Sequence, residues 1–569
     1  MKNYKLLILL IAVTFWGCAK YLERDIITNL REDLVNKSYD FTRNRVSAIY
    51  NMLPQGFTEI DGAMLASATD EAEHTNETSN IQKFNTGAWN IYDNPDGVWY
   101  RSYQAIRMVN VFLNTSDSVN LDAYRLNPEA SQQLIYQNRL AEIKRWKYEV
   151  RFIRAFFYSE LIKRYGGVPI ITELYSLNDD PSTQRRNTLA ESIKYVVDEC
   201  DSAAANLPVT YTIDDLGRVT KGAALALKSR MLLYAASDLF NNTSWASGYA
   251  SPELVSMPSG DRSVRWKAAA DAAKAVIDLG GSGYALHSGY AALFRTFNSP
   301  EIIFTRRAGT SNNFERASFP VGYEGQSGTT PSQNLVDAYE VKVSSSVSAQ
   351  FDWNNASHAA NPYANRDPRL GFTVLLNNTT FKGRAVESFI GGLDGMGNVN
   401  ATRTGYYLRK YVDESINLLT GTTSVHSWIF IRLAEVYLNY GEALNEYNPG
   451  HADIKTYVDR IRTRSGVAMP ALPAGLSQSQ MRDRIRNERR VELAFEGHRA
   501  FDARRWMIGS ESLGATLRGV RIERGSTGSF SYAPFNVEPR AFEPKMYLYP
   551  IPQQELLKAE GLVQNPIWK

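Results

Sequence analysis

The feature that most constrains the fold is a series of segments with apolar residues at helical spacing, each closed by glycine or proline. VWYRSYQAIRMVNVFLN (98–114) contains no internal glycine or proline. RWKYEVRFIRAFFYSELIKRYGG (145–167) ends in two glycines, and Pro169 lies just beyond. This spacing and these stop signals predict amphipathic helices. Later segments with the same character are 189–208, 220–240, 265–280, 428–448 and 452–466.

These segments share a scheme rather than an exact repeat. Alanine and glycine stand where neighbouring helices would approach, and aromatic residues fill the space between them. Tetratricopeptide-like arrays stack helix pairs in this way, and because no single pair can bury its own apolar face, several must pack together. We therefore predict a superhelix of tetratricopeptide-like helix pairs. An irregular helical domain without repeats is the alternative.

The composition changes between 281 and 427, where Gly, Ser, Asn, Thr and Pro dominate. Short apolar runs such as EIIFTRR (301–307) and GYYLRKYV (405–412) interrupt this region, and the tail 526–569 is similar. The pattern predicts a loop-rich part with a few short strands, attached to an otherwise all-α fold. Long loops on a rigid scaffold are where binding residues usually lie.

The N-terminus has the pattern of an export signal. Lys2 and Lys5 precede an apolar stretch, 6–15, that is far shorter than the roughly twenty residues needed to span a bilayer. Gly17 and Cys18 follow it, as in the lipobox of bacterial lipoproteins. We predict lipidation of Cys18, whose two or three acyl chains would hold the protein stably on a membrane. An ordinary signal peptide with an incidental cysteine is the alternative.

Charge and motif content argue against several classes of function. The 63 basic and 60 acidic residues give a net charge of +3, so nothing in the charge favours nucleic acid. The six histidines form no HExxH motif, and GxSxG, P-loop and GxGxxG motifs are absent. Cys200 would have no partner once Cys18 is lipidated, so no disulfide is expected. We expect no metal, no cofactor and no catalytic residues.

The densest charge cluster, 481–506, contains eight arginines interleaved with acidic residues. Its Glu488 and Glu492 would lie one helical turn apart. Such interleaving is unlike a nucleic-acid patch and predicts an internal ion-pair network that braces the helices. Networks of this kind give a unique arrangement more readily than net stability.

Acidic and aromatic residues in two polar stretches are the candidate ligand contacts. The stretch 68–94 contains acids and three aromatic rings among Asn and Gly, and 312–328 contains three more rings. A flat aromatic ring can cover the apolar C–H face of a sugar, while polar groups bind its hydroxyl rim. The alternative is that these rings fix the loops to the scaffold. The candidates are Asp70, Glu71, Phe84, Trp89, Asn90, Tyr92, Phe314, Phe319 and Tyr323.

Several segments together resemble the SusD/RagB family of outer-membrane nutrient-binding lipoproteins. Besides the lipobox, they are FIRAFFYSELIKRYGGVPI, PSQNLVDAYEV, NRDPRL, IRLAEVYLNYGEAL, IRNERRVELAFEGHRAFDARRW, YLYPIPQQEL and QNPIW, in the order of the family. The resemblance covers nearly all of the mature chain. Phe15 and Trp16 replace the commoner lipobox residues, which concerns processing and not family membership.

The resemblance implies an organisation and a role. The chain would comprise a lipoprotein signal peptide (1–17), an N-terminal helical part (18–280) and a C-terminal part that is first loop-rich and then helical (281–569). It would be lipid-anchored and surface-exposed on the outer membrane. There it would bind a glycan without catalysis, for import by a SusC-like TonB-dependent transporter. A peptide-binding RagB-like role is the alternative. The ligand residues of the family vary with substrate, so none is carried over.

Overall fold

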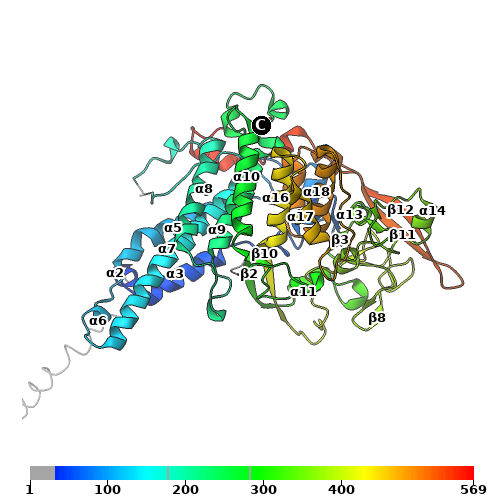
Figure 1. Ribbon diagram of the computed structural model, residues 1–569, viewed down its shortest axis with the longest axis horizontal. Coiled ribbons are helices and arrows are strands. Elements are labelled where there is room, and N and C mark those ends of the chain that lie inside the picture. Colours follow the sequence, from blue (N-terminus) through cyan, green and yellow to red (C-terminus); the bar gives the residue numbers. More distant parts are fainter. Residues whose placement is uncertain (1–31, 176–177, 281–282, 569) are drawn as a thin grey trace, which may run out of the picture.

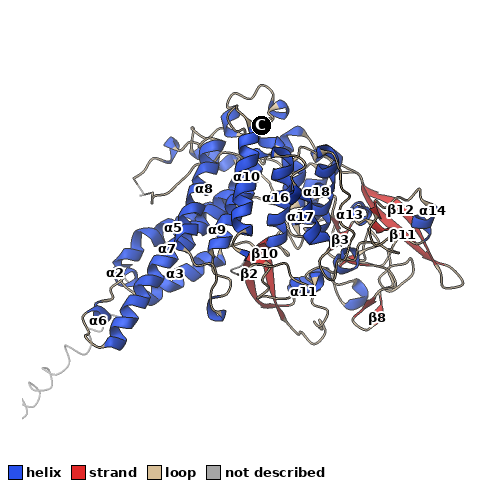
Figure 2. Cartoon of the chain, viewed as in Figure 1, coloured by secondary structure: helices blue, strands red, loops and turns tan. Residues whose placement is uncertain are grey.

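Helices dominate the computed structural model, which describes residues 32–175, 178–280 and 283–568 (Figure 2). The long helices are α3 (Tyr39–Asn51), α5 (Trp99–Thr115), α7 (Ala130–Tyr165), α8 (Leu189–Asn206), α9 (Lys221–Ala236), α10 (Arg262–Ile277), α16 (Leu433–Tyr447), α17 (Ala452–Arg462) and α18 (Gln478–Glu492). Shorter helices are α2 (Glu32–Asn36), α4 (Gln82–Thr86), α6 (Asp122–Arg125), α11 (Tyr290–Leu293), α12 (Asn313–Ser318), α13 (Gln333–Ala338), α14 (Ala356–Ala360), α15 (Arg369–Thr373), α19 (Arg499–Arg505), α20 (Gly509–Ser512) and α21 (Gln553–Lys558).

Local sequence signals set the ends of these helices. A capping box formed by Thr188 and Glu191 starts α8. Gly166, with a φ of +77°, ends α7, as the Gly-Gly pair predicts. Helix α7 begins at Ala130, well before the predicted start at residue 145. The sequence does not indicate this earlier start, because the first turns of the helix are mostly exposed and carry no apolar stripe.

Successive helices pack side by side in the order α7, α8, α9, α10 and α16, with α17 and α18 against α16 (Figure 1). Alanines at the α9–α10 contact, among them Ala223 and Ala273, are fully buried and allow close approach. The predicted helical array with small residues at its contacts is thus confirmed. Because α16 packs directly on α9 and α10, the helical core continues across the predicted boundary at 280.

The strands form only two-stranded antiparallel sheets among the described residues. Their pairs are β1 (Ala72–His74) with β3 (Thr329–Pro331), β2 (Ile302–Ser311) with β10 (Ser424–Arg432), β4 (Val341–Lys342) with β5 (Ser348–Ala349), β6 (Val374–Leu375) with β9 (Tyr407–Leu408), β7 (Thr380–Phe381) with β8 (Arg384–Ala385), and β11 (Leu517–Arg524) with β12 (Phe530–Glu538). The loop-rich part with short strands is therefore confirmed.

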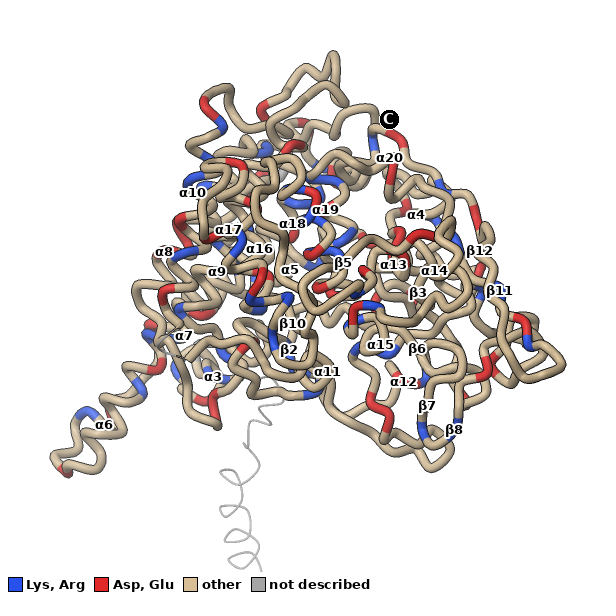
Figure 3. Tube along the Cα trace, turned by 45° about the vertical axis from the view of Figure 1, so that its right-hand side comes forward, with Lys and Arg blue, Asp and Glu red and all other residues tan. Residues whose placement is uncertain are grey.

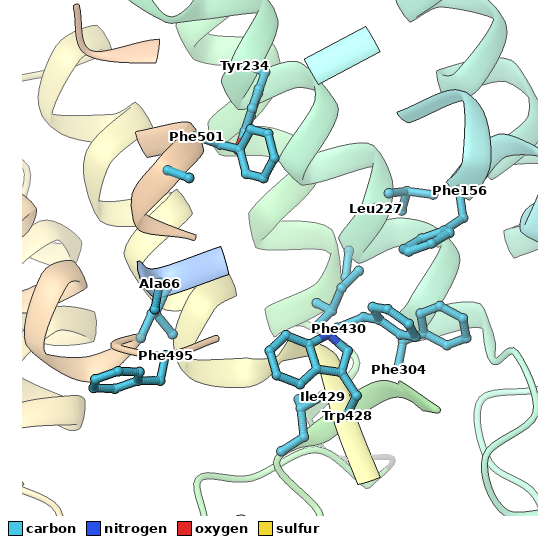
Figure 4. Close-up of a cluster of buried hydrophobic side chains, with 14 of the residues drawn as sticks. Ala66, Phe156, Leu227, Tyr234, Phe304, Trp428, Ile429, Phe430, Phe495 and Phe501 are labelled. Carbon is cyan, nitrogen blue, oxygen red and sulfur yellow. The ribbon is translucent and has the colours of Figure 1, made fainter. Parts of the chain in front are cut away.

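Two strand assignments differ from the sequence prediction. Residues 428–432 belong to β10 rather than to a helix, and α16 begins only at Leu433. Phe430 of β10 stacks on Phe304 of β2, with ring centroids 5.1 Å apart, in the buried cluster of Figure 4. The second difference is the long β11–β12 hairpin, which projects at the right of Figure 1 and begins at Leu517, before the tail that was predicted to contain short strands.

Many charged residues are buried between the helices. Figure 3 marks the positions of Lys, Arg, Asp and Glu along the backbone. Glu488 and Glu492 of α18 are buried, and each binds several arginines, with distances of 2.6–2.8 Å for the contacts with Arg369, Arg432 and Arg462. Arg464 also binds Glu492. The predicted internal network is confirmed, but these partner arginines come from segments other than 481–506. Within 481–506, Arg489 and Arg505 bind Asp502 at 2.7 and 2.8 Å, and Arg505 also binds Glu442 outside the segment.

Candidate functional site

The aromatic rings of the first predicted stretch do not face solvent, with one exception. Phe84 and Trp89 are buried, and Trp89 packs against Tyr549 and Trp568 with ring centroids 5.1 and 4.8 Å apart. Tyr92 is 79% exposed. The expectation that Phe84 and Trp89 offer open faces to a sugar is therefore wrong, because residues near the C-terminus cover them. They fix the loop to the scaffold instead.

The rings of the second stretch are covered as well. Phe314 packs against Phe57 with ring centroids 4.8 Å apart. Phe319 and Tyr323 both pack against Phe381, and all three predicted rings are at most 5% exposed. The expectation of open stacking faces is wrong here too, and the alternative, that these rings fix the loop, describes their contacts.

Asp70 and Glu71 are buried acids rather than groups at the surface. Arg490 of α18 and Arg499 of α19 donate to Asp70 at 2.8 and 2.7 Å. These two charges outweigh burial and hold the pKa of Asp70 well below its usual range. Burial, together with the charge of Asp70, raises the pKa of Glu71 to about 8. The expectation that these two acids contact a ligand is corrected, because neither is accessible.

Asn90 and Tyr92 remain the exposed candidates of the nine. The side-chain oxygen of Asn90 accepts from the backbone N–H of Tyr92 at 2.9 Å, which forms a tight polar turn. Their role in ligand binding stays a prediction. Cys18 lies outside the described residues.

The two predicted stretches are nevertheless neighbours in space. Strand β1 pairs with β3, so that Glu73 lies opposite Thr330 and His74 opposite Thr329. Beyond the sheet, Thr75 donates its backbone N–H to Gly328 at 2.9 Å and its hydroxyl to Ser327 at 2.6 Å. The ladder therefore continues past β1 and carries the chain onto the surface at residues 75–80.

An open groove of about 450 Å³ lies at this edge of the sheet. It is built by three segments that are distant in sequence: the turn after β1, the loop between β8 and β9, and the end of β12. We call it the loop groove. Its lining residues are Thr75, Glu77, Met396, Gly397, Asn398, Asn400, Ala401, Thr402, Arg403, Phe535 and Val537.

Arg403 links the floor of the loop groove to β1. Its guanidinium binds the buried Glu73 at 2.8 Å and the exposed Glu77 at 3.0 Å. Burial and the charge of Glu538 raise the pKa of Glu73 to about 7, although Arg403 opposes this rise. One arginine is thus shared by acids on two sides, so the groove offers no unpaired positive charge at this point.

Neutral polar groups and one aromatic ring make up the rest of the loop groove. The amide of Asn398 donates to the backbone oxygens of Gly392 and Leu393 at 2.9 and 3.1 Å. The side chain of Asn400 has no hydrogen-bond partner within the described part of the chain, and it is exposed. Half-buried Phe535 supplies an apolar surface beside them. This combination of few polar groups and an apolar face suits a neutral, hydroxylated ligand.

Sequence reasoning missed the loop at 396–403 because it contains no aromatic residue and has no apolar periodicity. Its signal is a run of Gly and Asn, GMGNVN, in the loop-rich part. Over the described residues, no helix is long and apolar enough to cross a membrane.

The fold is thus a helical array that carries a polar groove on its long loops. The comparisons place it more closely: the chain belongs to the SusD/RagB family. The model of the SusD family matches residues 300–568, and a SusD-like model described as starch-binding associating with outer membrane matches 33–233.

Individual relatives agree with this assignment. SusD-like protein P25 of Formosa agariphila is 23% identical over 87% of this chain and 88% of its own length. SusD-like protein P2 of the same organism is 32% identical, over 26% of each chain. A SusD-like structure from Bacteroides fragilis has a TM-score of 0.75 at 25% identity, covering 94% of this chain and 98% of its own. A SusD-like carbohydrate binding protein from Bacteroides fragilis has the same TM-score at 23% identity, covering 93% of this chain and 100% of its own, and shares the fold.

Proposed function

We propose that this protein binds a glycan at the cell surface and holds it, chemically unchanged, for import. The observation that carries the proposal is the loop groove, where one aromatic ring lies beside neutral amide and hydroxyl groups on an open surface. Membership of the SusD/RagB family supports this proposal. Two proteins with the same fold support it as well, because one is named a SusD-like carbohydrate binding protein and the other a laminarin binding SusD-like protein. These names favour a carbohydrate over the peptide alternative.

The geometry favours a neutral segment of an oligosaccharide. Phe535 would cover the C–H face of one sugar ring, and Asn398 and Asn400 would bind hydroxyls at its rim. Arg403, which is already bound by Glu73 and Glu77, has little charge left for a uronate or sulfate group. An open groove of this kind accepts an internal stretch of a chain, since both ends can leave the site.

Phe535→Ala tests this arrangement. Loss of one stacked ring costs about 1–3 kcal/mol by analogy with base stacking, so affinity should fall about 5- to 150-fold. The matched control is Phe530→Ala, on the same strand and also half-buried, whose ring packs against Phe389 and does not line the groove.

A glycan array on the purified protein first identifies a ligand, and calorimetry then compares the two variants. Equal affinities in Phe535→Ala and Phe530→Ala would remove the groove from the binding site. Release of shortened products from the bound glycan would contradict the non-catalytic role.

The proposal extends to a partner and a location. A binder that cannot itself transport requires a pore, and the family points to a SusC-like TonB-dependent outer-membrane transporter. The protein would be anchored beside it through lipidated Cys18. Affinity purification from native membranes in mild detergent should recover a β-barrel protein together with this chain. Recovery of the chain alone under several detergents would favour a free-standing surface binder.

A further inference from the structure

A second hollow, of about 240 Å³, lies within the helical part and shares no lining residue with the loop groove. We call it the inner chamber. Its wall is assembled from residues 54–66, residues 95–101, the C-terminal end of α7, the middle of α9, β10 and residues 495–501. These segments are far apart in the sequence, so no local motif predicts the chamber.

Aromatic side chains form much of the wall of the inner chamber. Figure 4 shows Tyr234 and Phe501 on one side, Phe495 on a second and Trp428 on a third, around a common space. Gly56, with a φ of +65°, lies so close to the indole of Trp428 that a Cβ there would be 2.2 Å from it. The backbone therefore holds the indole in place, and the wall is preformed.

The charged groups of the wall already have partners, and the acid Glu496 binds Lys410 and Arg432 outside the wall. Each basic side chain binds an acid at 2.6–3.1 Å, and the pairs are Lys163–Glu160, Arg164–Asp96, Arg230–Glu435 and Arg101–Glu59. An ionic ligand would bring a charge with no counter-charge left to meet it, which is costly in a buried space. The chamber therefore suits a neutral ligand.

Three neutral donors of the wall lack an acceptor within the described part of the chain. Two of them are the hydroxyl of Tyr234 and the indole N–H of Trp428. The third is a ring N–H of His498. Burial and the charge of the neighbouring Arg489 hold the pKa of His498 well below its usual value, so the ring is neutral. Arg489 lies 3.4 Å from Nδ1 of His498 and can only donate, which places the ring hydrogen on Nε2. The nearest carboxylate, Glu435, is 3.9 Å from Nε2 and beyond hydrogen-bond distance.

We propose that the inner chamber is a second binding site, for one neutral sugar ring or a cyclic polyol. Its volume lies just below the roughly 300–1,000 Å³ of sites for larger ligands. Ring hydroxyls accept from Tyr234, Trp428 and His498, and the apolar ring face rests on the aromatic wall. The proposal does not rest on the function of the loop groove. Glu59 and Arg101 are the more exposed of the paired groups, so the entrance lies on their side.

Tyr234→Phe is the sharpest test, because it removes a donor that the protein itself does not use. The probes are glucose, galactose and myo-inositol, with glucuronate as the charged analogue, followed by saturation-transfer NMR and calorimetry on the full mature protein. At least one neutral probe should bind, and Tyr234→Phe should weaken it about fivefold. Tyr195→Phe is the matched control, since it also removes a buried hydroxyl without a partner, outside the chamber.

A second variant, Ala66→Leu, fills the chamber and should abolish binding of the probe. Phe535→Ala, in the loop groove, should leave it unchanged. The proposal is overturned if no neutral probe binds at millimolar concentration. It is also overturned if the Tyr234→Phe and Tyr195→Phe variants have the same affinity for the neutral probe. If only Phe535→Ala lost binding of the neutral probe, the probe would bind in the loop groove and the proposal would fail. If glucuronate bound as tightly as the neutral probes, the inference that the chamber takes a neutral ligand would be wrong.

Discussion

Replacement of Glu71 by glutamine should stabilise the protein at pH 8 and leave it nearly unchanged at pH 5. Glu71 is buried, and among the described residues only the backbone N–H of Phe495, at 3.3 Å, donates to its carboxylate. Burial and the adjacent Asp70 raise its pKa to about 8. Glutamine has the shape of the protonated acid and keeps an oxygen that can accept from Phe495.

The sign follows from proton binding in the two states. The unfolded chain releases the proton of Glu71 near pH 4.3, whereas the folded protein keeps it up to about pH 8. Between these values the folded state binds more protons, so its stability falls as pH rises. Integration between pH 5 and 8 gives a loss of about 3–4 kcal/mol. An unfolding entropy of about 2.1 cal/mol/K per residue converts this loss into about 3 °C of melting temperature for a chain of this length.

The assay is thermal unfolding of wild type and Glu71→Gln at pH 5, 6, 7 and 8. The difference in melting temperature between the two proteins should grow by about 3 °C across the series. The other titrating groups are common to both and cancel. Glu253→Gln, an exposed site, should keep a constant difference from wild type. A flat difference for Glu71→Gln would mean that the folded protein carries the ionised acid without cost, which would refute the reasoning from burial.

Three further outcomes are expected. Glu492→Gln removes one negative charge from a buried network and leaves Arg369, Arg432 and Arg464 only their other acids, so it should cost about 3–5 kcal/mol. Asp198→Asn in the exposed pair with Lys194 should cost less than about 1 kcal/mol. Denaturation midpoints compare the two variants, and equal midpoints would remove the network from the stability argument. Cys18→Ala should move the protein out of the membrane fraction, and unchanged fractionation would contradict lipidation. Tyr92→Ala should leave the melting temperature unchanged because the ring is exposed, and calorimetry with the identified glycan will decide whether this ring contacts the ligand.

The helical array was predictable because its signals are local. Apolar spacing and the terminal glycines of 145–167 lie within a few residues of the helix they define. The same reasoning failed at 428–432, where an apolar run passes from β10 into α16 without a break, and only the pairing with β2 separates strand from helix.

The candidate site was less predictable because exposure depends on distant partners. Trp89 looks like a surface ring in its own loop, yet it is covered by Tyr549 and Trp568 from the other end of the chain. Asn400 is marked in its local sequence only by a run of Gly and Asn, and it lines the groove only because β1 and β12 bring their ends beside its loop. Local composition selected rings that distant residues cover, and of the two predicted stretches only Thr75 and Glu77 line the groove.

The acids that resemble ligand contacts in the sequence instead connect the groove to the scaffold. Arg490 and Arg499 fix Asp70 to the helical part, and β1 begins two residues later. Glu73 of β1 then binds Arg403, which holds the loop of the groove against the strand. The floor of the groove is therefore connected through β1 and Asp70 to α18, the helix that also carries Glu488 and Glu492. Asn400, beyond this floor, makes no side-chain hydrogen bond to the rest of the described chain, so substitution there should leave the fold that presents the groove undisturbed.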